Sequence, residues 1–409
     1  MLSSPAIIIR RRSLFLEKPR KPFPHSVSQT LKTLNTAAIA RQKEMGKAEK
    51  ERLKQTLNFH LNTIHETFQV LDQSPASSLE KVSWEEVIKL GDQVSKQATM
   101  AGMLWTGEMP DVKALEENMS AYFNTLQGFL LHSHGSMVGA GHTLSSSIHT
   151  SVKQVVDCSF KLWMESVSSY AGSRNNVQKL SIPQLVGAVW EACSALKKTP
   201  STNITAIGRG MTQVAVSLKD VLREIEELKP GSSDQTDETY DEASNKADSD
   251  LQDDDDNSCE DDLGNDLLPG EMKIAQLAIG VVSDTLAVIK ELIRTITGLL
   301  KMENPNNTEF VDCLEKLLKL CQGIGAQIDE LGACLYPPQE VPAMKASSEK
   351  ISSIIDDLMV ELESVKGTSQ AFIQACDGLR NSLRLFEYEL GCCSTSDLEA
   401  KLQNVTLSN

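Results

Sequence analysis

One stretch of the sequence carries a hydrophobic repeat that leaves little freedom in the choice of fold. Between residues 310 and 335, large apolar residues alternate steps of four and three without an error: Phe310, Leu314, Leu317, Cys321, Ile324, Ile328, Leu331 and Leu335. This spacing places all eight side chains on one stripe of an α-helix. Because such a helix is stable only when neighbours cover its stripe, the segment predicts a packing seam inside a helical bundle.

Similar stripes recur along most of the chain. Residues 45–230 contain six amphipathic segments, and residues 269–391 contain four, counting the seam; prolines at 337, 338 and 342 break the chain between the second and third of these four. Ser83 with Glu86 three residues later is a capping-box signature for a helix start. Aromatic residues make up only 5% of the 409 residues, which disfavours sheets. We therefore expect an all-α protein with two antiparallel bundles, an N-terminal one at 45–230 and a four-helix one at 269–391.

The net charge of −16 is concentrated in one segment. Residues 232–266 hold fifteen acidic residues and one lysine, with few apolar side chains. Such a segment cannot bury enough surface to offset the entropy of ordering, and its charges repel one another within the screening length of about 8 Å. We expect residues 231–268 to form a disordered acidic linker between the bundles. Its densest runs are Asp253, Asp254, Asp255 and Asp256, and Glu260, Asp261 and Asp262.

Residues 1–44 carry the opposite charge, with nine basic and two acidic residues. The segment is rich in Arg, Lys, Ser and Thr, as organelle transit peptides are. An upstream extension before Met45, or a disordered tail, fits the same composition. We therefore expect a basic, disordered arm at 1–44, and a tail at 392–409.

The apolar stretch at 274–300 is the longest, and it contains Asp284, Lys290, Glu291 and Arg294. These charges fall within the length of about 18–20 residues that a membrane span needs, so we expect no membrane span and a soluble protein. The nine cysteines are odd in number and mostly sit within helical patterns. This usage favours reduced thiols that act as small apolar residues in a reducing compartment.

The sequence offers no catalytic, metal or cofactor site that we would predict. His132, His134, His142 and His149 invite a metal hypothesis, but no Cys or acidic pair accompanies them at ligand spacing. The glycine-rich residues 135–141 lack the Gly-Lys-Ser/Thr ending of a phosphate loop, so we interpret them as a break between helices. The Gly-x-Ser-x-Gly motif does not occur in the sequence. No Glu-x-x-His motif offers a bundle core the ligands for a cofactor, which disfavours a bundle-core enzyme.

Direct nucleic-acid binding is also disfavoured, since both helical blocks are acidic and the segment at 232–266 repels phosphate. That segment would instead attract a basic partner. Ser258 precedes Glu260, Asp261 and Asp262, as in a site for an acidophilic kinase, and is a candidate phosphorylation site. The vicinal pair Cys392-Cys393 is interpreted as incidental.

Several stretches resemble the Grap- and cyclin-D-interacting protein family, which binds D-type cyclins. They are Val189-Trp-Glu-Ala-Cys193 followed by the long helical segment 203–229, the acidic insert, and residues 324–331 running into Leu335-Tyr-Pro-Pro338. Their order and spacing agree over roughly residues 50–390. The resemblance implies an all-helical, two-domain protein without enzymatic activity, in the nucleus and cytoplasm. It also implies partners, namely D-type cyclins and helix-loop-helix transcription regulators, and restraint of cell-cycle or transcriptional output.

The residues and the resemblance together predict a helical interaction module. A partner helix would lie in a groove between bundle helices while the acidic segment attracts a basic region of the partner. Long Ser/Ala-rich bundles also occur in vinculin- and talin-like adaptors, so a scaffold of the cytoskeleton or membrane surface is the alternative. The oligomeric state does not follow from the sequence.

Overall fold

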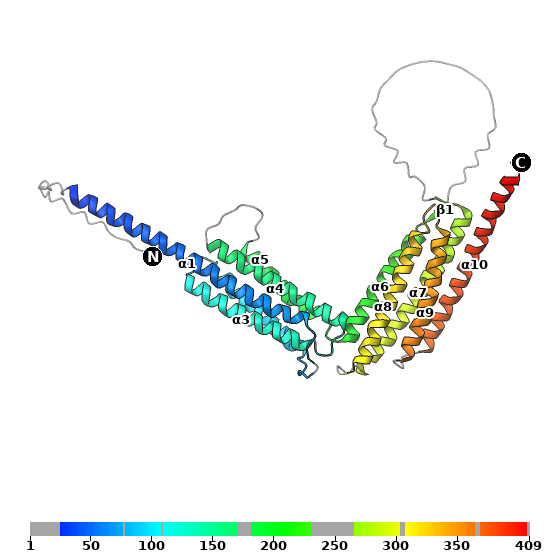
Figure 1. Ribbon diagram of the computed structural model, residues 1–409, viewed down its shortest axis with the longest axis horizontal. Helices are drawn as coiled ribbons and strands as arrows, with labels where there is room; N and C mark the ends of the chain where they lie inside the picture. Colours follow the sequence, from blue (N-terminus) through cyan, green and yellow to red (C-terminus); the bar gives the residue numbers. More distant parts are fainter. Residues whose placement is uncertain are drawn as a thin grey trace, which may run out of the picture.

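The architecture comes from a computed structural model that describes residues 25–76, 78–107, 109–170, 181–230, 266–302, 307–364 and 369–406. The described chain is almost entirely helical, which confirms the predicted all-α fold class (Figure 1). The α-helices are α1 His25–Gln69, α2 Trp84–Met103, α3 Val112–Ser136, α4 His142–Tyr170, α5 Ile182–Ala195, α6 Asn203–Glu226, α7 Pro269–Gly298, α8 Thr308–Ala333, α9 Val341–Ser364 and α10 Gln370–Thr406. Short elements are the 3-10 turns η1 Val70–Asp72, η2 Leu196–Lys198 and η3 Leu299–Met302, and the strands β1 Lys229–Pro230 and β2 Asp266–Leu267.

Helices α1 to α5 surround one core. These helices form a ring in the order α1, α3, α2, α5 and α4, and α4 contacts α1 to close it. Five helices of alternating direction can close a ring only if one neighbouring pair runs parallel, and here that pair is α1 and α3. The core centre is aromatic, with the rings of Tyr122 and Trp163 edge to face at 5.6 Å.

The helix starts follow from local side chains. Ser83 accepts a hydrogen bond from the backbone N–H of Glu86 at 3.3 Å, so the predicted cap of α2 is confirmed. Asp111 does the same for Ala114 at the start of α3. Each cap satisfies a backbone donor that has no partner within its helix.

Helices α6 to α10 form the second unit, again a ring of five, in the order α6, α7, α10, α9, α8 and back to α6. The parallel pair in this ring is α6 and α8. The predicted seam is confirmed, because Leu314, Leu317, Cys321, Ile324, Ile328, Leu331 and Leu335 are all 0% exposed. Only Phe310, at the start of the stripe, is partly exposed.

The position of α6 differs from the expectation. We expected it in the N-terminal bundle at 45–230, but Ile207, Met211 and Leu218 are buried with α7 and α8 in the second core. The division between the cores therefore falls between α5 and α6, and the second bundle has five helices rather than four. An apolar stripe shows that a helix is covered on one side, but it does not identify the covering helix.

The ends of the acidic segment are held together. Lys229 of β1 pairs with Asp266 of β2, and Pro230 with Leu267, in a parallel register. Leu267 is 1% exposed, so the expected linker is ordered at residues 266–268. Because β1 follows α6 and β2 precedes α7, the segment is an insert within the second unit rather than a connection between units. Residues 231–265 lie outside the described residues.

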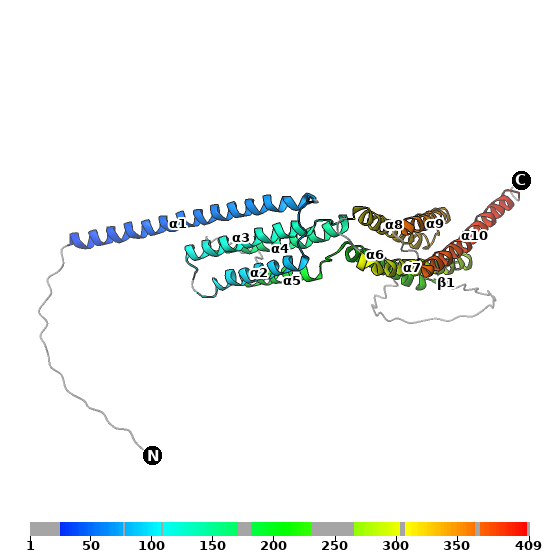
Figure 2. The same ribbon diagram turned by 90° about the horizontal axis from the view of Figure 1, so that it is seen from below.

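Other expected boundaries change as well. Residues 25–44 of the expected disordered arm belong to α1, which projects beyond the other helices of its unit (Figure 2). This part of α1 follows Pro24 and contains no proline or glycine. The expected tail continues α10 as far as Thr406. Pro342 lies in the first turn of α9, where its missing N–H breaks no helical hydrogen bond.

Helix α7 is long and apolar enough to cross a membrane by length and composition, with a mean hydropathy of 1.6 over its best 18 residues. The sequence-based expectation from its charges is therefore too strict. Half of that window is buried, and Ile274, Val281, Val288 and Ile296 belong to the second core. A core helix of this kind passes the same test as a membrane helix.

Candidate interaction surface at the joint between the two units

The two units meet where α4 begins. Gly141, which precedes the helix, has no side chain to cap it. The cap comes instead from α8 of the other unit, because the carboxylate of Glu315 accepts hydrogen bonds from the backbone N–H of Thr143 at 2.8 Å and from its hydroxyl at 2.6 Å. A negative charge at a helix N-terminus also complements the helix dipole. The joint is thus a charged, directional contact.

A second contact at the joint involves Asn203, the first residue of α6. Its side-chain oxygen accepts a hydrogen bond from the backbone N–H of Gly141 at 2.8 Å, and its amide donates to the carbonyl of Gly139 at 2.9 Å. Gly139 has φ of 69°, a left-handed conformation that glycine adopts without strain. The predicted helix break at 135–141 is therefore confirmed, and it supplies the backbone groups of the joint.

Glycine at position 141 is also a steric requirement. A Cβ there would lie 2.6 Å from Oε1 of Glu315 and 2.7 Å from Cγ1 of Val311. A side chain at position 141 would therefore force the carboxylate of Glu315 and the side chain of Val311 to shift. The close approach of α8 to the start of α4 therefore depends on this glycine.

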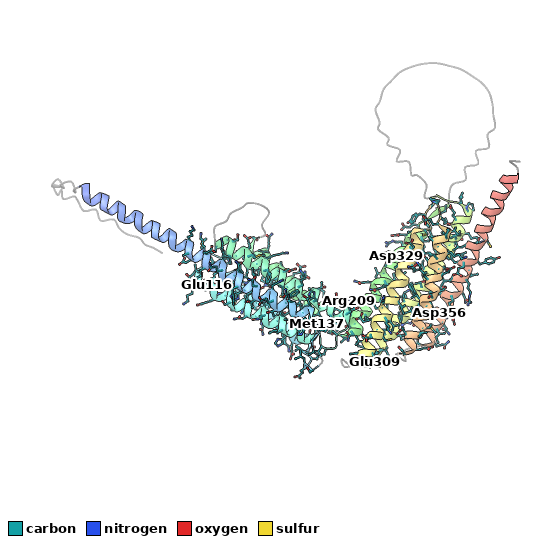
Figure 3. All side chains as sticks on the ribbon, viewed as in Figure 1. Glu116, Met137, Arg209, Glu309, Asp329 and Asp356 are labelled. Carbon is teal, nitrogen blue, oxygen red and sulfur yellow. The ribbon has the colours of Figure 1, made fainter. Side chains whose placement is uncertain are left out.

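A groove of about 610 Å³ lies at the joint between α4, α6 and α8. Most of the residues that line it are of polar types: His142, Thr143, Ser146, Ser147, Gly210, Gln213, Glu315, Lys316, Leu318, Lys319 and Gln322. A smaller depression beside it includes Arg209, which is labelled at the joint in Figure 3 and donates to the carbonyl of Lys198 at 2.6 Å. A groove with hydroxyl, amide and lysine groups suits hydrogen bonding to a peptide backbone or polar side chains.

The histidines considered for metal binding lie in separate places. His142 lines the joint groove, whereas the ring of His149 packs on Phe68 at 4.9 Å. His132 contacts the carbonyl of Gly128 in its own helix at 2.9 Å. Within the described residues, His, Cys, Asp and Glu side chains form no group of three or more that could hold a metal ion.

The buried cysteines have thiols of low reactivity. Burial raises the pKa of the thiols of Cys193 and Cys321 to about 12 and that of Cys376 to about 11, so these thiols stay protonated at neutral pH. Cys392 is exposed near the end of α10. All cysteines that the structure describes are free, which agrees with the expected role of helical cysteines as apolar residues.

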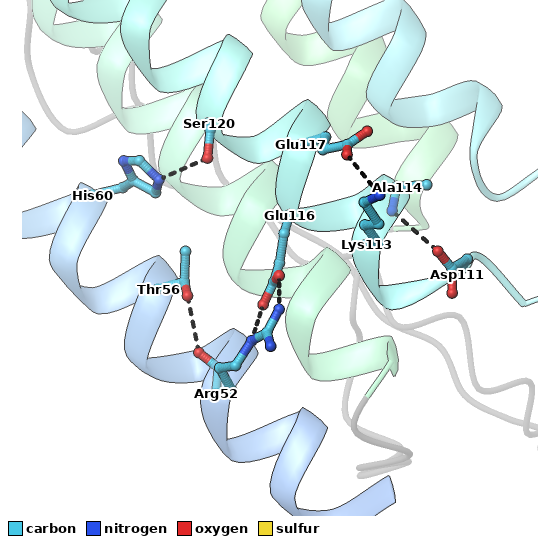
Figure 4. A network of polar contacts seen from close by, with 9 residues as sticks. All are labelled: Arg52, Thr56, His60, Asp111, Lys113, Ala114, Glu116, Glu117 and Ser120. Atoms are coloured by element: carbon cyan, nitrogen blue, oxygen red, sulfur yellow. Dashed lines mark hydrogen bonds and ion pairs between the residues drawn. The ribbon is translucent and has the colours of Figure 1, made fainter.

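The contact between α1 and α3 is polar along its edge (Figure 4). The guanidinium of Arg52 forms a two-pronged ion pair with Glu116, and the ring of His60 lies near the hydroxyl of Ser120. The same ring stacks on Phe123 at 5.0 Å, and burial lowers the pKa of His60. These contacts fix α1 on the outside of its unit, where it covers the aromatic core.

The candidate partner-binding residues from the sequence are not placed by the structure. Asp253, Asp254, Asp255, Asp256, Glu260, Asp261 and Asp262 lie outside the described residues, as does Ser258. The joint residues Asn203 and Glu315 were not predicted from the sequence. The available signal was a helix start at Gly141 without a capping side chain, but nothing local identifies the carboxylate that replaces it.

Comparison with known proteins decides the family. The N-terminal domain model of the Grap2 and cyclin-D-interacting family matches residues 86–231, and its C-terminal domain model matches residues 251–360. The chain belongs to this family. The Xenopus laevis cyclin-D1-binding protein 1 homolog is 23% identical over 285 residues, which cover 68% of this chain and 78% of the relative. The resemblance stated from the sequence is confirmed.

The family match covers some helices of the protein and not others. The N-terminal model begins within α2 and extends past α6, while the C-terminal model ends within α9. Helices α1 and α10 therefore lie outside the matched residues. A surface used by the family as a whole is expected on α2 to α9.

Proposed function

We propose that this chain is a non-enzymatic interaction protein that binds a D-type cyclin. The observation that carries this proposal is the match of both family domain models, which together extend over both helical units. The named relative, a cyclin-D1-binding protein homolog, aligns over most of its own length, so the similarity is not confined to one helix pair. Because a bound cyclin is unavailable to its other partners, binding restrains the cell cycle.

Helix-loop-helix transcription regulators are the second partner class in the proposal. Their basic regions carry the charge that the acidic insert would attract, since residues 232–266 have a net charge of −14. The parallel pairing of β1 with β2 brings both ends of this insert to one end of the second unit. A basic segment would therefore meet a concentrated negative charge beside the bundle.

Co-precipitation of the full chain from cells tests the partners. We expect recovery of D-type cyclins and of helix-loop-helix proteins, with the protein in nucleus and cytoplasm. A second chain that lacks residues 1–24 shows whether this basic segment affects the location of the protein or the recovery of its partners. If the full chain is cleaved and imported into an organelle, the segment acts as a transit peptide. Recovery of neither partner class, together with co-sedimentation with actin or liposomes, would favour the adaptor alternative.

Charge neutralisation tests the acidic insert. Replacing Asp253, Asp254, Asp255 and Asp256 by Asn should weaken binding to a basic helix-loop-helix protein and flatten its salt dependence. The matched control replaces four exposed acids of the second unit by their amides: Glu309, Glu349, Asp357 and Glu363. Extending the change to Glu260, Asp261 and Asp262 should add to the effect. Equal affinities of the insert variant and the control variant would remove the insert from the proposal.

A further inference from the structure

The smaller depression at the joint is lined by cations and hydroxyl groups, without an acidic residue. It lies between α4, η2 and α6 and has a volume of about 330 Å³. Its two charged residues are Lys198 and Arg209, and five of the other lining residues carry hydroxyl groups. Ser146 and Ser147 line both this depression and the larger groove, so the two hollows are continuous. We call the smaller hollow the cationic depression.

The segments that form the cationic depression contain no acids. The chain has 56 Asp and Glu residues, yet none occurs at 118–156, which includes the first half of α4. None occurs at 192–219 either, which includes η2 and most of α6. Within the described residues, neither Lys198 nor Arg209 forms an ion pair. Their charges are therefore not neutralised by the protein itself, although its net charge is −16.

Acidic residues around the cationic depression lie outside its lining. Asp157 pairs with Lys153 on α4 at 2.7 Å, and Asp72 pairs with His149 at 3.1 Å. Glu191 is exposed on α5, one turn before the first lining residue of that helix. In the adjoining groove, the carboxylate of Glu315 is bonded to the start of α4. The depression therefore keeps two positive charges on its own surface.

The guanidinium of Arg209 is held in place by a backbone carbonyl instead of a carboxylate. Its Nη2 donates to the carbonyl of Lys198 at 2.6 Å, where Figure 3 labels Arg209 at the joint. Its other nitrogens, Nε and Nη1, form no hydrogen bond within the part of the chain that the structure describes. A guanidinium fixed in this way loses less entropy when its remaining donors bind an oxyanion.

Ser146 adds a free hydroxyl at the edge of the cationic depression. The residue is exposed, and its hydroxyl forms no hydrogen bond with any described residue. The hydroxyls of Ser147, Thr150 and Ser151 instead donate to carbonyls one turn earlier in α4. Because a helical side chain leans toward the N-terminus of its helix, Ser146 lies over the first turn of α4, next to the start of α6.

We propose that the cationic depression binds the phosphate group of a phosphorylated serine or threonine in a segment of a partner protein. A phosphate monoester carries a charge of about −1.5 to −2 at pH 7, which two unneutralised cations match better than the single charge of a carboxylate. Arg209 and Lys198 donate to the phosphate oxygens, as does the hydroxyl of Ser146. The adjoining groove takes the peptide on one side of the phosphorylated residue.

Binding at this place would connect the two helical units. Lys198 belongs to η2, whose Leu196 is buried in the first core, whereas Arg209 belongs to α6 of the second unit. A phosphate held by both side chains bridges the units. We therefore expect slower amide hydrogen exchange at residues 195–210 in the complex.

The test uses the purified full chain and two immobilised pools of short peptides with randomised flanks. One pool has a central phosphoserine and the other a central serine. We expect retention on the phosphoserine pool at least about tenfold above that on the serine pool, with elution by phenyl phosphate and by salt. Arg209→Gln with Lys198→Gln should lower this retention at least about tenfold. The matched control removes two exposed lysines of α9, Lys345→Gln with Lys350→Gln, and should change retention less than twofold.

Three outcomes would overturn the proposal. They are equal retention on both pools, unchanged retention of the folded Arg209→Gln, Lys198→Gln variant, and equal displacement by single-stranded DNA or phosphatidylserine vesicles, which would show a general polyanion surface. Ser146→Asp places a negative charge at the edge of the depression and should also abolish the preference for phosphoserine. It decides the question if the double variant does not fold, with circular dichroism as the check. Because no cyclin is present, the proposed function stands or falls separately.

Discussion

The carboxylate of Glu315, on α8, accepts hydrogen bonds from both the backbone N–H and the hydroxyl of Thr143, on α4, and so connects the second helical unit to the first. Both bonds are partly buried, and Gly141 leaves the space that the carboxylate occupies. Asn203 and Arg209 of α6 also bond to the first unit, and Ala206 of α6 is buried in the first core. The relative orientation of the units therefore depends on the Glu315 contact together with these contacts of α6.

Removing the carboxylate should loosen the joint without unfolding either core. We expect Glu315→Ala to increase amide hydrogen exchange at the start of α4 and to broaden the size distribution in small-angle X-ray scattering. Glu315→Gln keeps an acceptor oxygen but loses the charge at the helix N-terminus, which is worth about 0.3–1 kcal/mol. Its effect should be smaller than that of alanine, and identical exchange in all three proteins would contradict the role of Glu315.

Close packing of α6 on α8 should depend on glycine. A Cβ at Gly325 would lie 2.9 Å from Cγ1 of Val214, so Gly325→Val forces the two helices apart. We expect a loss of about 1–3 kcal/mol in the free energy of unfolding, measured with urea. Gly187→Ala is the control, because its open site and the higher helix propensity of alanine predict no loss. An unchanged Gly325→Val protein would show that α6 does not lie as described.

The boundary between the cores can be tested with fragments of the first unit. A fragment that ends at residue 230 contains α6 without α7 and α8, leaving Ile207, Met211 and Leu218 uncovered. We expect α6 to exchange its amides rapidly in this fragment and the fragment to self-associate, whereas a fragment that ends at residue 201 stays monomeric. Slow exchange of α6 in the longer fragment would instead place it in the first bundle, as the stripes alone suggested.

Burial of Cys321 predicts a loss of stability in alkaline solution. The pKa of its thiol is about 12 in the folded protein against 9.0 as the ordinary value, so this stability is complete below pH 9 and is lost between pH 9 and pH 12. By pH 10 ionisation of the thiol should stabilise the unfolded chain by about 1.4 kcal/mol. The stability difference between the unmodified chain and Cys321→Ala should shrink by that amount from pH 8 to pH 10. A constant difference in urea unfolding would contradict the burial.

The sequence predicts the helices better than their arrangement. The stripe from Leu314 to Leu335 is visible because its period is local, and the structure buries all of it. The stripe of α6 is equally regular, but the choice between α4 and α8 as its neighbour depends on contacts far apart in the chain. The acidic insert was recognised by composition, yet its position within the second unit follows only from the pairing of Lys229 with Asp266.

The contact between the two units could not be predicted from local sequence either, because its residues lie far apart in the chain. A glycine before a helix indicates an empty cap, and Glu315 lies 172 residues away in sequence. Trp190 is 46% exposed, and it belongs to a stretch that carries the family resemblance. Its exposure could not be predicted, because a tryptophan within an amphipathic helix is more often buried.

Cyclin binding can be measured directly by isothermal titration calorimetry of a purified D-type cyclin with the purified full chain at physiological salt. We expect a saturable one-to-one complex with a negative change in heat capacity, since apolar surface is buried on binding. The absence of detectable heat or complex at cyclin concentrations up to about 100 μM would contradict the proposed function.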